Sequence, residues 1–351
     1  MTGTRIGRLR SILHDRGLDG IVVTTLVNVR YLTGFTGSNG AVVVASDGPA
    51  VLLTDGRYRD QAAVQCPDLE VVVDRDLIGS AAARLHGTWA VETHTLSVDA
   101  HRDLTERSTA QLVGAERVVE SLREVKDETE VAALRRACQI SVDALEWLWT
   151  QRLSGRTERQ LARLVENRML ELGAEAIAFD TIVAAGEHSA IPHHEPTDRP
   201  VAVGDLLKVD FGARVDGYHA DCTRTVTIGP AADWQREIHA AVQESQAAGV
   251  AVCTEGTAVA DVDAAARRSL EASGWLEHFT TGLGHGVGLQ IHEDPFIGAQ
   301  HAGRLVSRTV LTVEPGIYLP GRGGVRIEDT VAVGSHAEIL TTTPTDLLEI
   351  A

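Results

Sequence analysis

The chain has 351 residues, of which 44% are hydrophobic and 23% are charged, and its formal net charge is −17. This composition is ordinary for a soluble globular protein, and the length suggests two domains. The negative charge argues against a nucleic acid partner, because phosphate binding requires a basic surface, and no apolar run is long enough to cross a bilayer.

The segment before residue 121 alternates patterns typical of helices and strands. Apolar residues at helical spacing predict a helix over residues 6–13 that ends near Gly17. Short apolar runs predict buried strands at 21–23, 41–44, 51–53, 71–73 and 88–91. This alternation predicts an α/β domain over residues 1–122.

Residues 123–351 contain one order of elements twice. Asp127 with Glu130, and Thr157 with Gln160, form capping-box patterns that predict the starts of two amphipathic helices. Strands and turns follow, and then two further helices are expected at about 233–248 and 258–272, before strand-like segments at 279–333. The order of two helices and then strands predicts an internally duplicated α+β domain.

The four cysteines are widely spaced and form no CxxC pair. Neither a zinc knuckle nor a disulfide framework is indicated, and a reduced, cytoplasmic setting fits best. Nucleophilic catalysis is not favoured, because the sequence has no G-x-S-x-G motif and no cysteine in an activating context.

The strongest local pattern is a pair of aspartates, Asp210 and Asp221, on either side of the turn pair Asp216-Gly217. This turn predicts a two-residue hairpin. Its register places Asp221 opposite Gly212 and makes Asp210 a diagonal neighbour on the same sheet face. The two carboxylates could hold a pair of cations, although solvated aspartates on an exposed face fit the pattern about equally well.

Two glutamates lie in apolar stretches on either side of a turn-rich segment, residues 320–324. Glu314 follows one predicted strand, and Glu328 lies in the next. A buried ionised carboxylate is costly unless it is paired or bound to a metal. For either glutamate alone, a solvent-facing position or a pairing with Arg326 is the simpler interpretation.

Three histidines complete the set of candidate residues. His285 lies among four glycines, which allow a close backbone approach but do not fit the dinucleotide motif GxGxxG. His292 would lie on the opposite face of a regular strand, unless the glycines bend the chain. His193 lies in a loop between prolines, where histidines are usually exposed. Four carboxylates with one imidazole suit Mn²⁺, Co²⁺, Fe²⁺ or Zn²⁺.

Together these segments resemble the pita-bread metallopeptidases, the family of aminopeptidase P, prolidase, methionine aminopeptidase and creatinase. The resemblance rests on the Asp-x10-Asp spacing, the glycine run around His285, Glu314 before Pro-Gly and Glu328 before Asp. Residues 32–35 and 54–58 resemble the N-terminal domain of the proline-specific branch. The resemblance implies an α/β N-terminal domain and an α+β pita-bread domain, in which helices cover an internally duplicated antiparallel sheet.

The resemblance also implies a set of metal ligands. The five ligands would be Asp210, Asp221, His285, Glu314 and Glu328, and they would bind two divalent metal ions. Mn²⁺ is the expected metal, with Co²⁺, Zn²⁺ and Fe²⁺ as alternatives. Asp210 would bind one ion, His285 and Glu314 the other, and the remaining two carboxylates would bridge them.

The same resemblance assigns catalytic roles and a substrate. His193 and His292 would contact the peptide, Glu314 would also relay a proton, and Arg326 would support Glu328. Thr281 stands where some proline-specific members have a further histidine. The substrates would be small peptides with proline at the second position, cleaved by a cytoplasmic homodimer acting as an Xaa-Pro aminopeptidase or Xaa-Pro dipeptidase (prolidase). The alternatives are a non-catalytic binding protein on the same fold and a methionine-aminopeptidase-like exopeptidase.

Overall fold

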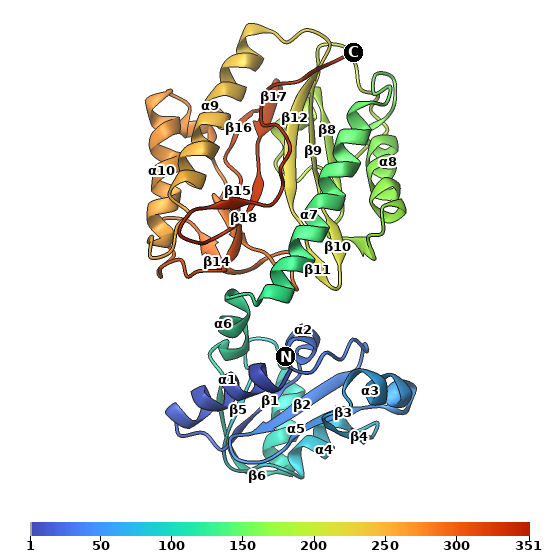
Figure 1. Cartoon of the computed structure of the whole chain (residues 1–351), viewed down its shortest axis with the longest axis vertical. Coiled ribbons are helices and arrows are strands. Elements are labelled where there is room, and N and C mark those ends of the chain that lie inside the picture. The colour runs from blue at the N-terminus through green and yellow to red at the C-terminus, as the bar shows by residue number, and fades with distance from the viewer. Residues whose placement is uncertain (1) are drawn as a thin grey trace. The chain divides into compact units, whose positions relative to one another are not determined.

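The computed structural model of the chain describes residues 2–351, so Met1, the first residue of the predicted N-terminal domain, lies outside the described residues. The described chain divides into two units, one that ends at Arg123 and one that runs from Glu124 to Ala351. In Figure 1 the first unit is coloured from blue to teal, and the second from green to red.

The N-terminal unit is built on one six-stranded sheet with the order β4-β3-β2-β1-β5-β6. Only β2 is antiparallel to its neighbours, and the other neighbouring pairs are parallel. The strands are β1 (Gly20–Val23), β2 (Gly40–Ala45), β3 (Ala50–Thr54), β4 (Glu70–Val73), β5 (His86–Val91) and β6 (Thr109–Gly114). The helices are α1 (Thr2–Asp15), α2 (Leu26–Thr33), α3 (Arg59–Gln65), α4 (Leu77–Ala82), α5 (Val98–Arg107) and α6 (Val118–Glu124).

The predicted strands of this unit are confirmed, and the predicted α/β class with them. The runs at β1, β2 and β3 are β-branched or apolar and are buried almost throughout, as expected for strands covered on both faces. The sequence pattern did not indicate β6. This strand lies at the edge of the sheet and is only partly buried, so it carries no continuous apolar run.

The C-terminal unit contains the predicted order of elements twice. Its helices are α7 (Glu128–Trp149), α8 (Glu158–Glu171), α9 (Asp233–Ala251) and α10 (Val259–Ala272). The strands after α8 are β7 (Ala176–Ile177), β8 (Ile182–Ala185), β9 (Leu206–Phe211), β10 (Ala213–Val215), β11 (Tyr218–His219) and β12 (Cys222–Ile228). Those after α10 are β13 (Gly284–Gly286), β14 (Glu293–Ile297), β15 (Val310–Val313), β16 (Gly316–Leu319), β17 (Gly323–Arg326), β18 (Asp329–Ala332), β19 (Glu338–Ile339) and β20 (Glu349–Ile350).

Local hydrogen bonds fix the starts of α7 and α8, the first two helices of the C-terminal unit. Both predicted capping boxes are present, Asp127 with Glu130 at α7 and Thr157 with Gln160 at α8. The apolar faces of α7 and α8 pack on one core with β8 and β9, whereas α9 and α10 pack on a second core with β15 to β18. Figure 1 shows the two helix pairs on either side of the strands.

The two halves of this unit meet along β12. A backbone bridge joins Thr223 to Glu328, and the hydroxyl of Thr225 donates to the carbonyl oxygen of Arg326 over 3.0 Å. Arg224 donates to the carbonyl oxygen of Glu328 over 2.6 Å and forms an ion pair with Asp329. Residues from both halves can therefore contribute to one site at this junction.

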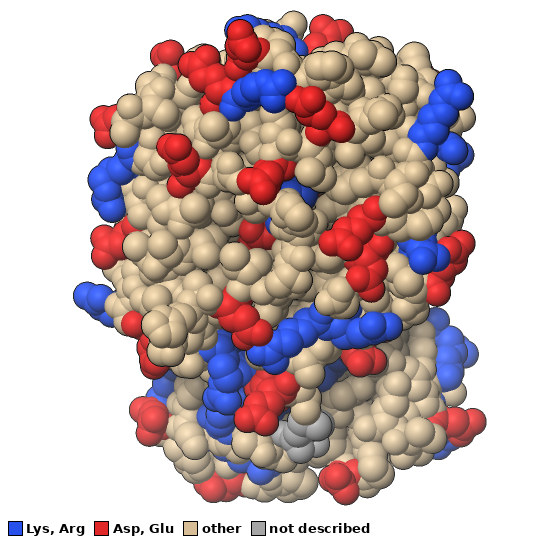
Figure 2. Space-filling model, turned by 45° about the horizontal axis from the view of Figure 1, so that its top comes forward, with Lys and Arg blue, Asp and Glu red and all other residues tan. Residues whose placement is uncertain are grey.

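Charged side chains of both signs lie on the surface, and the cysteines lie in the interior. Figure 2 shows Asp and Glu side chains distributed over the face drawn, interspersed with Lys and Arg. Within residues 2–351, no helix combines the length and the apolar character needed to span a bilayer. The four cysteines are buried and none is in a disulfide.

Candidate metal centre

The predicted hairpin positions the two aspartates. Asp216 and Gly217 have φ values of 50° and 80°, as a two-residue hairpin turn requires. The pairing of β9 with β12 places Thr223 opposite Asp210, so that Asp221 is its diagonal neighbour. A Cβ on Gly212 would lie 1.8 Å from the carbonyl oxygen of the residue before Asp221, so only glycine permits this approach.

His285 approaches the aspartates from the other half of the unit. Its Nε2 lies 3.5 Å from an oxygen of Asp221 and 3.4 Å from an oxygen of Glu314. Its Nδ1 lies 3.1 Å from the carbonyl oxygen of Gly286, which only accepts, so Nδ1 carries the proton. Burial lowers the pKa of His285 to about 4. The neutral ring therefore turns the lone pair of Nε2 towards the carboxylates, an arrangement that a cation between them would satisfy.

Glu328 and Asp210 complete the cluster. Glu328 is buried, and one of its oxygens accepts a hydrogen bond of 2.7 Å from the hydroxyl of Thr223. The second oxygen of Asp210 forms an ion pair with Arg326, and its Oδ1 is buried without a hydrogen-bond partner. An unpaired buried carboxylate oxygen is costly, and it is an available metal ligand.

Arg326 contacts several groups of the cluster. Its guanidinium pairs with Asp210, lies 3.9 Å from Glu314 and donates to the hydroxyl of Tyr318 over 3.0 Å. It reaches Glu328 only through the hydroxyl of Thr223. Its charge also opposes the effects of burial and of neighbouring carboxylates, which raise the pKa of Glu328. The support of Glu328 by Arg326 stays a prediction.

The charge balance of the cluster fits divalent cations. Burial and repulsion from neighbouring carboxylates raise the pKa of Asp221 and of Glu328 well above the usual range. Burial also raises the pKa of Glu314 to about 7, against the opposing effect of Arg326. One guanidinium cannot balance four carboxylates, and ligand atoms of Asp221, His285 and Glu328 lie within 4.8 Å of one another. The residues present therefore fit a site for divalent metal ions.

The cluster forms the wall of a pocket of about 90 Å³. His193 and His292 are exposed and also line this pocket. The glycine-containing chain after β13 bends, so that the rings of His285 and His292 lie 4.4 Å apart between centroids. Thr281 is not among the residues that line this pocket, and its hydroxyl is buried without a hydrogen-bond partner.

Three apolar residues of the pocket were missed by the sequence analysis, namely Phe179, Ile182 and Ile291. Ile182 pairs with Asp210 across β8 and β9, so the strand register carried a usable signal for it. Ile291 directly precedes His292. Phe179 lies in a short connection with no pattern of its own. These side chains give the pocket an apolar wall beside its carboxylates.

Comparison with known families decides the assignment. The family model of the metallopeptidase family M24 matches residues 132–335, and that of the creatinase/prolidase N-terminal domain matches residues 5–125. The chain belongs to metallopeptidase family M24. This membership confirms the predicted metallopeptidase class, and it implies divalent metal ions at the site.

Relatives of this M24 peptidase match it over nearly its whole length. The Xaa-Pro dipeptidase of Pyrococcus furiosus is 34% identical over 348 residues, covering 98% of this chain and 99% of the relative. The structure of an Xaa-Pro dipeptidase from Bacillus anthracis has a TM-score of 0.96 at 34% identity, covering 99% and 100% of the two chains. That of an X-Pro aminopeptidase from Thermotoga maritima has a TM-score of 0.89 at 35% identity, covering 95% and 98%. The predicted two-part fold is thereby confirmed.

Proposed function

We propose that this M24 peptidase hydrolyses the peptide bond before proline in small peptides, as an Xaa-Pro aminopeptidase or Xaa-Pro dipeptidase. The observation that carries the proposal is the convergence of four carboxylates and a neutral imidazole beside a small pocket. The names of the Pyrococcus, Bacillus and Thermotoga relatives support the preference for proline. The apolar wall of the pocket suits a proline ring.

The five predicted ligands would hold two divalent ions. These ligands would be Asp210, Asp221, His285, Glu314 and Glu328, which all line the pocket. Mn²⁺ is the proposed metal, and Co²⁺, Zn²⁺ and Fe²⁺ suit the same oxygen-rich ligand set. When bound, the two ions supply Lewis acidity, which makes water a nucleophile near neutral pH and polarises the scissile carbonyl.

The remaining steps belong to side chains of the chain itself. Glu314 faces the pocket and is placed to take a proton from the attacking water and deliver it to the leaving proline nitrogen. His193 and His292 donate hydrogen bonds to the substrate and its developing oxyanion, worth about 3 kcal/mol for each donor. Arg326 keeps Asp210 oriented through their ion pair.

The proposal extends to the organisation and setting of the protein. It divides the chain into an N-terminal domain, residues 1–122, and a catalytic domain, residues 123–351. Four buried cysteines without disulfides suit the reducing cytoplasm. A homodimer is the assembly that the family resemblance implies, and small peptides, rather than nucleic acids or membranes, are the proposed partners.

The decisive test is a substrate panel. Ala-Pro, a longer Xaa-Pro peptide and Met-Ala are assayed with added Mn²⁺ or Co²⁺, and bound metal is measured by elemental analysis. Cleavage of either proline peptide, lost on chelation and restored by metal, is the expected result. Cleavage of Met-Ala alone would identify a methionine-aminopeptidase-like enzyme, and no cleavage with metal bound would favour a non-catalytic binding protein.

A further inference from the structure

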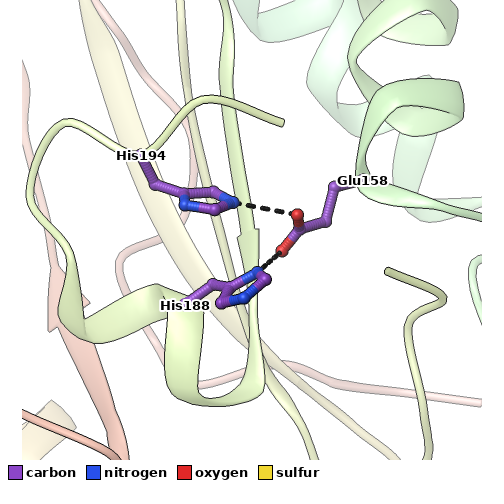
Figure 3. A group of neighbouring side chains, drawn as sticks. All are labelled: Glu158, His188 and His194. Atoms are coloured by element: carbon purple, nitrogen blue, oxygen red, sulfur yellow. Dashed lines mark hydrogen bonds and ion pairs between the residues drawn. The ribbon is translucent and has the colours of Figure 1, made fainter. Parts of the chain in front are cut away.

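A second cluster of one carboxylate and two imidazoles lies outside the candidate metal centre. Glu158, the first residue of α8, is fully buried. Its Oε1 accepts from the backbone N–H of Ala185 over 2.8 Å and from Nδ1 of His188 over 2.9 Å. Its Oε2 accepts from Nε2 of His194 over 2.9 Å, and from the backbone N–H and hydroxyl of Thr197 over 3.0 and 2.6 Å. Figure 3 shows both rings directed at the carboxylate.

All five donors come from one segment, residues 185–197. It runs from the end of β8 through the short 3₁₀ helix η2 (Gly186–Ala190) into the loop that carries His193. His193 is exposed and lines the pocket, whereas the next residue, His194, is buried against Glu158. The chain therefore turns one imidazole to the pocket and the next to the carboxylate.

The other flank of His193 is held by two basic side chains. Nζ of Lys208, fully buried in β9, donates to the carbonyl oxygens of Ile191 and Pro192 over 2.7 and 3.2 Å. Arg326 donates to the carbonyl oxygen of Pro192 over 3.1 Å. The two residues before His193 are thus tied to the strands, and the residue after it is tied to α8.

The spacing of Glu158, His188 and His194 also suits a metal ion. However, the carboxylate already accepts five hydrogen bonds, which exceeds its roughly four lone-pair directions. Burial raises the pKa of Glu158, but the bonds from Thr197, His194 and Ala185 outweigh it and lower that pKa to about 2. An ionised carboxylate only accepts, so both facing ring nitrogens carry protons and cannot bind a metal.

We propose that Glu158 is a positioning residue of the peptidase reaction, which holds residues 185–197 so that His193 faces the pocket. Glu158 touches no substrate and acts only through His193. The inference rests on the proposed function, in which His193 donates to the substrate.

The substitution Glu158→Gln keeps the shape of the side chain but removes its charge and replaces one acceptor by an N–H donor. That donor faces N–H groups from the loop, so at least two hydrogen bonds are lost. We expect kcat for Ala-Pro to fall about tenfold in E158Q and about 100-fold in H193A. KM and the bound metal stay close to their wild-type values in E158Q.

A double-mutant cycle separates positioning from general destabilisation. Wild type, E158Q, H193A and E158Q/H193A are assayed on Ala-Pro. If Glu158 acts through His193, E158Q lowers kcat in the wild-type background and leaves it unchanged in H193A. An equal loss of kcat in both backgrounds, or a loss of one metal ion in E158Q, would overturn the proposal.

The matched control is Glu92→Gln. Glu92, in the N-terminal unit, is also buried, and it accepts from the backbone N–H groups of Thr24 and Thr25 over 2.7 and 2.8 Å. Its substitution removes a comparable acceptor far along the chain from His193. E92Q should leave kcat unchanged, or change it equally in the wild-type and H193A backgrounds.

The NMR signal of the His193 ring tests the proposal without measuring turnover. In protein with isotope-labelled histidines, the ring signal missing from H193A identifies His193. This signal should shift or broaden in E158Q and stay in place in E92Q, even if no peptide is hydrolysed. An unmoved signal in folded E158Q refutes the positioning role. If E158Q does not fold, Thr197→Val removes one hydroxyl donor and should move the same signal less.

Discussion

Two groups of side chains in the C-terminal unit have the spacing of metal ligands, and they differ in charge balance. One comprises Asp221, His285 and Glu328, and the other comprises Glu158, His188 and His194. In the first, carboxylates outnumber their donors, and the histidine presents a lone pair. In the second, one carboxylate receives five hydrogen bonds. Spacing alone therefore does not distinguish a metal site from a hydrogen-bonded structural cluster. The number of hydrogen-bond donors around the carboxylates does distinguish them.

Burial raises the carboxyl pKa in both groups, but the net pKa shifts are opposite. Burial and neighbouring carboxylates raise the pKa of Asp221 and of Glu328. In the second group the hydrogen bonds lower the pKa of Glu158 to about 2, although burial opposes them. The first group needs external positive charge to be stable in ionised form, and the second does not. Each prediction below tests this contrast.

The largest expected effect is loss of activity on Asp221→Ala. Asp221 is a proposed metal ligand, so its removal should lower kcat for Ala-Pro by at least about 10³-fold while the fold is kept. The assay is paired with thermal unfolding. Asp216→Asn, at the exposed turn of the same hairpin, should keep wild-type activity. Unchanged turnover in metal-depleted D221A would discard the mechanism.

The next effect concerns stability and pH at Glu158. Its folded-state pKa of about 2 lies below the ordinary value of 4.5, so its contribution is complete above about pH 4.5 and is lost as pH falls towards 2. At pH 5, E158Q should lower the free energy of unfolding by roughly 3 kcal/mol. This difference from wild type should shrink by about 1.4 kcal/mol per pH unit below pH 4.5. Urea unfolding of both proteins at pH 5 and at pH 3.5 measures the difference. His188 and His194 contact the carboxylate, and Arg199 interacts with it electrostatically. A difference in unfolding free energy that is the same at both pH values would contradict the assignment of the low pKa to Glu158.

The smallest expected effect is a gain in stability, not a loss. In chelator, Asp221→Asn removes one of several crowded carboxylates, so metal-free protein should become more stable, by about 1–2 kcal/mol. With metal present the same substitution should be destabilising, because a ligand is lost. Thermal unfolding with and without EDTA tests the change of sign, and E158Q should be destabilising in both conditions. Destabilisation of metal-free D221N would show that the cluster is balanced without metal.

The sequence predicted features whose determinants lie close together in the chain. The capping box of Asp127 and Glu130 and the turn Asp216-Gly217 each need only a few residues, and both were found as predicted. The register set by that turn was enough to bring Asp210 and Asp221 to one face. Family resemblance supplied His285 and the two glutamates, which no local pattern could join to the hairpin.

Features that depend on distant packing were not predicted. Glu158 accepts from residues 27 to 39 positions away, and nothing near it in sequence indicates this role. The ion pair of Arg326 with Asp210 was not predicted, because it joins residues 116 positions apart in the chain. The bend between His285 and His292 was recognised only as a possibility, since glycines permit a bend without requiring it.

Metal stoichiometry tests the central claim most directly. Wild type, D221N and E158Q are loaded with Mn²⁺, freed of excess metal and measured by elemental analysis. The account predicts two ions per chain in wild type and in E158Q, and fewer in D221N. Wild type without bound metal, or an ion lost from E158Q while D221N keeps both, would contradict it.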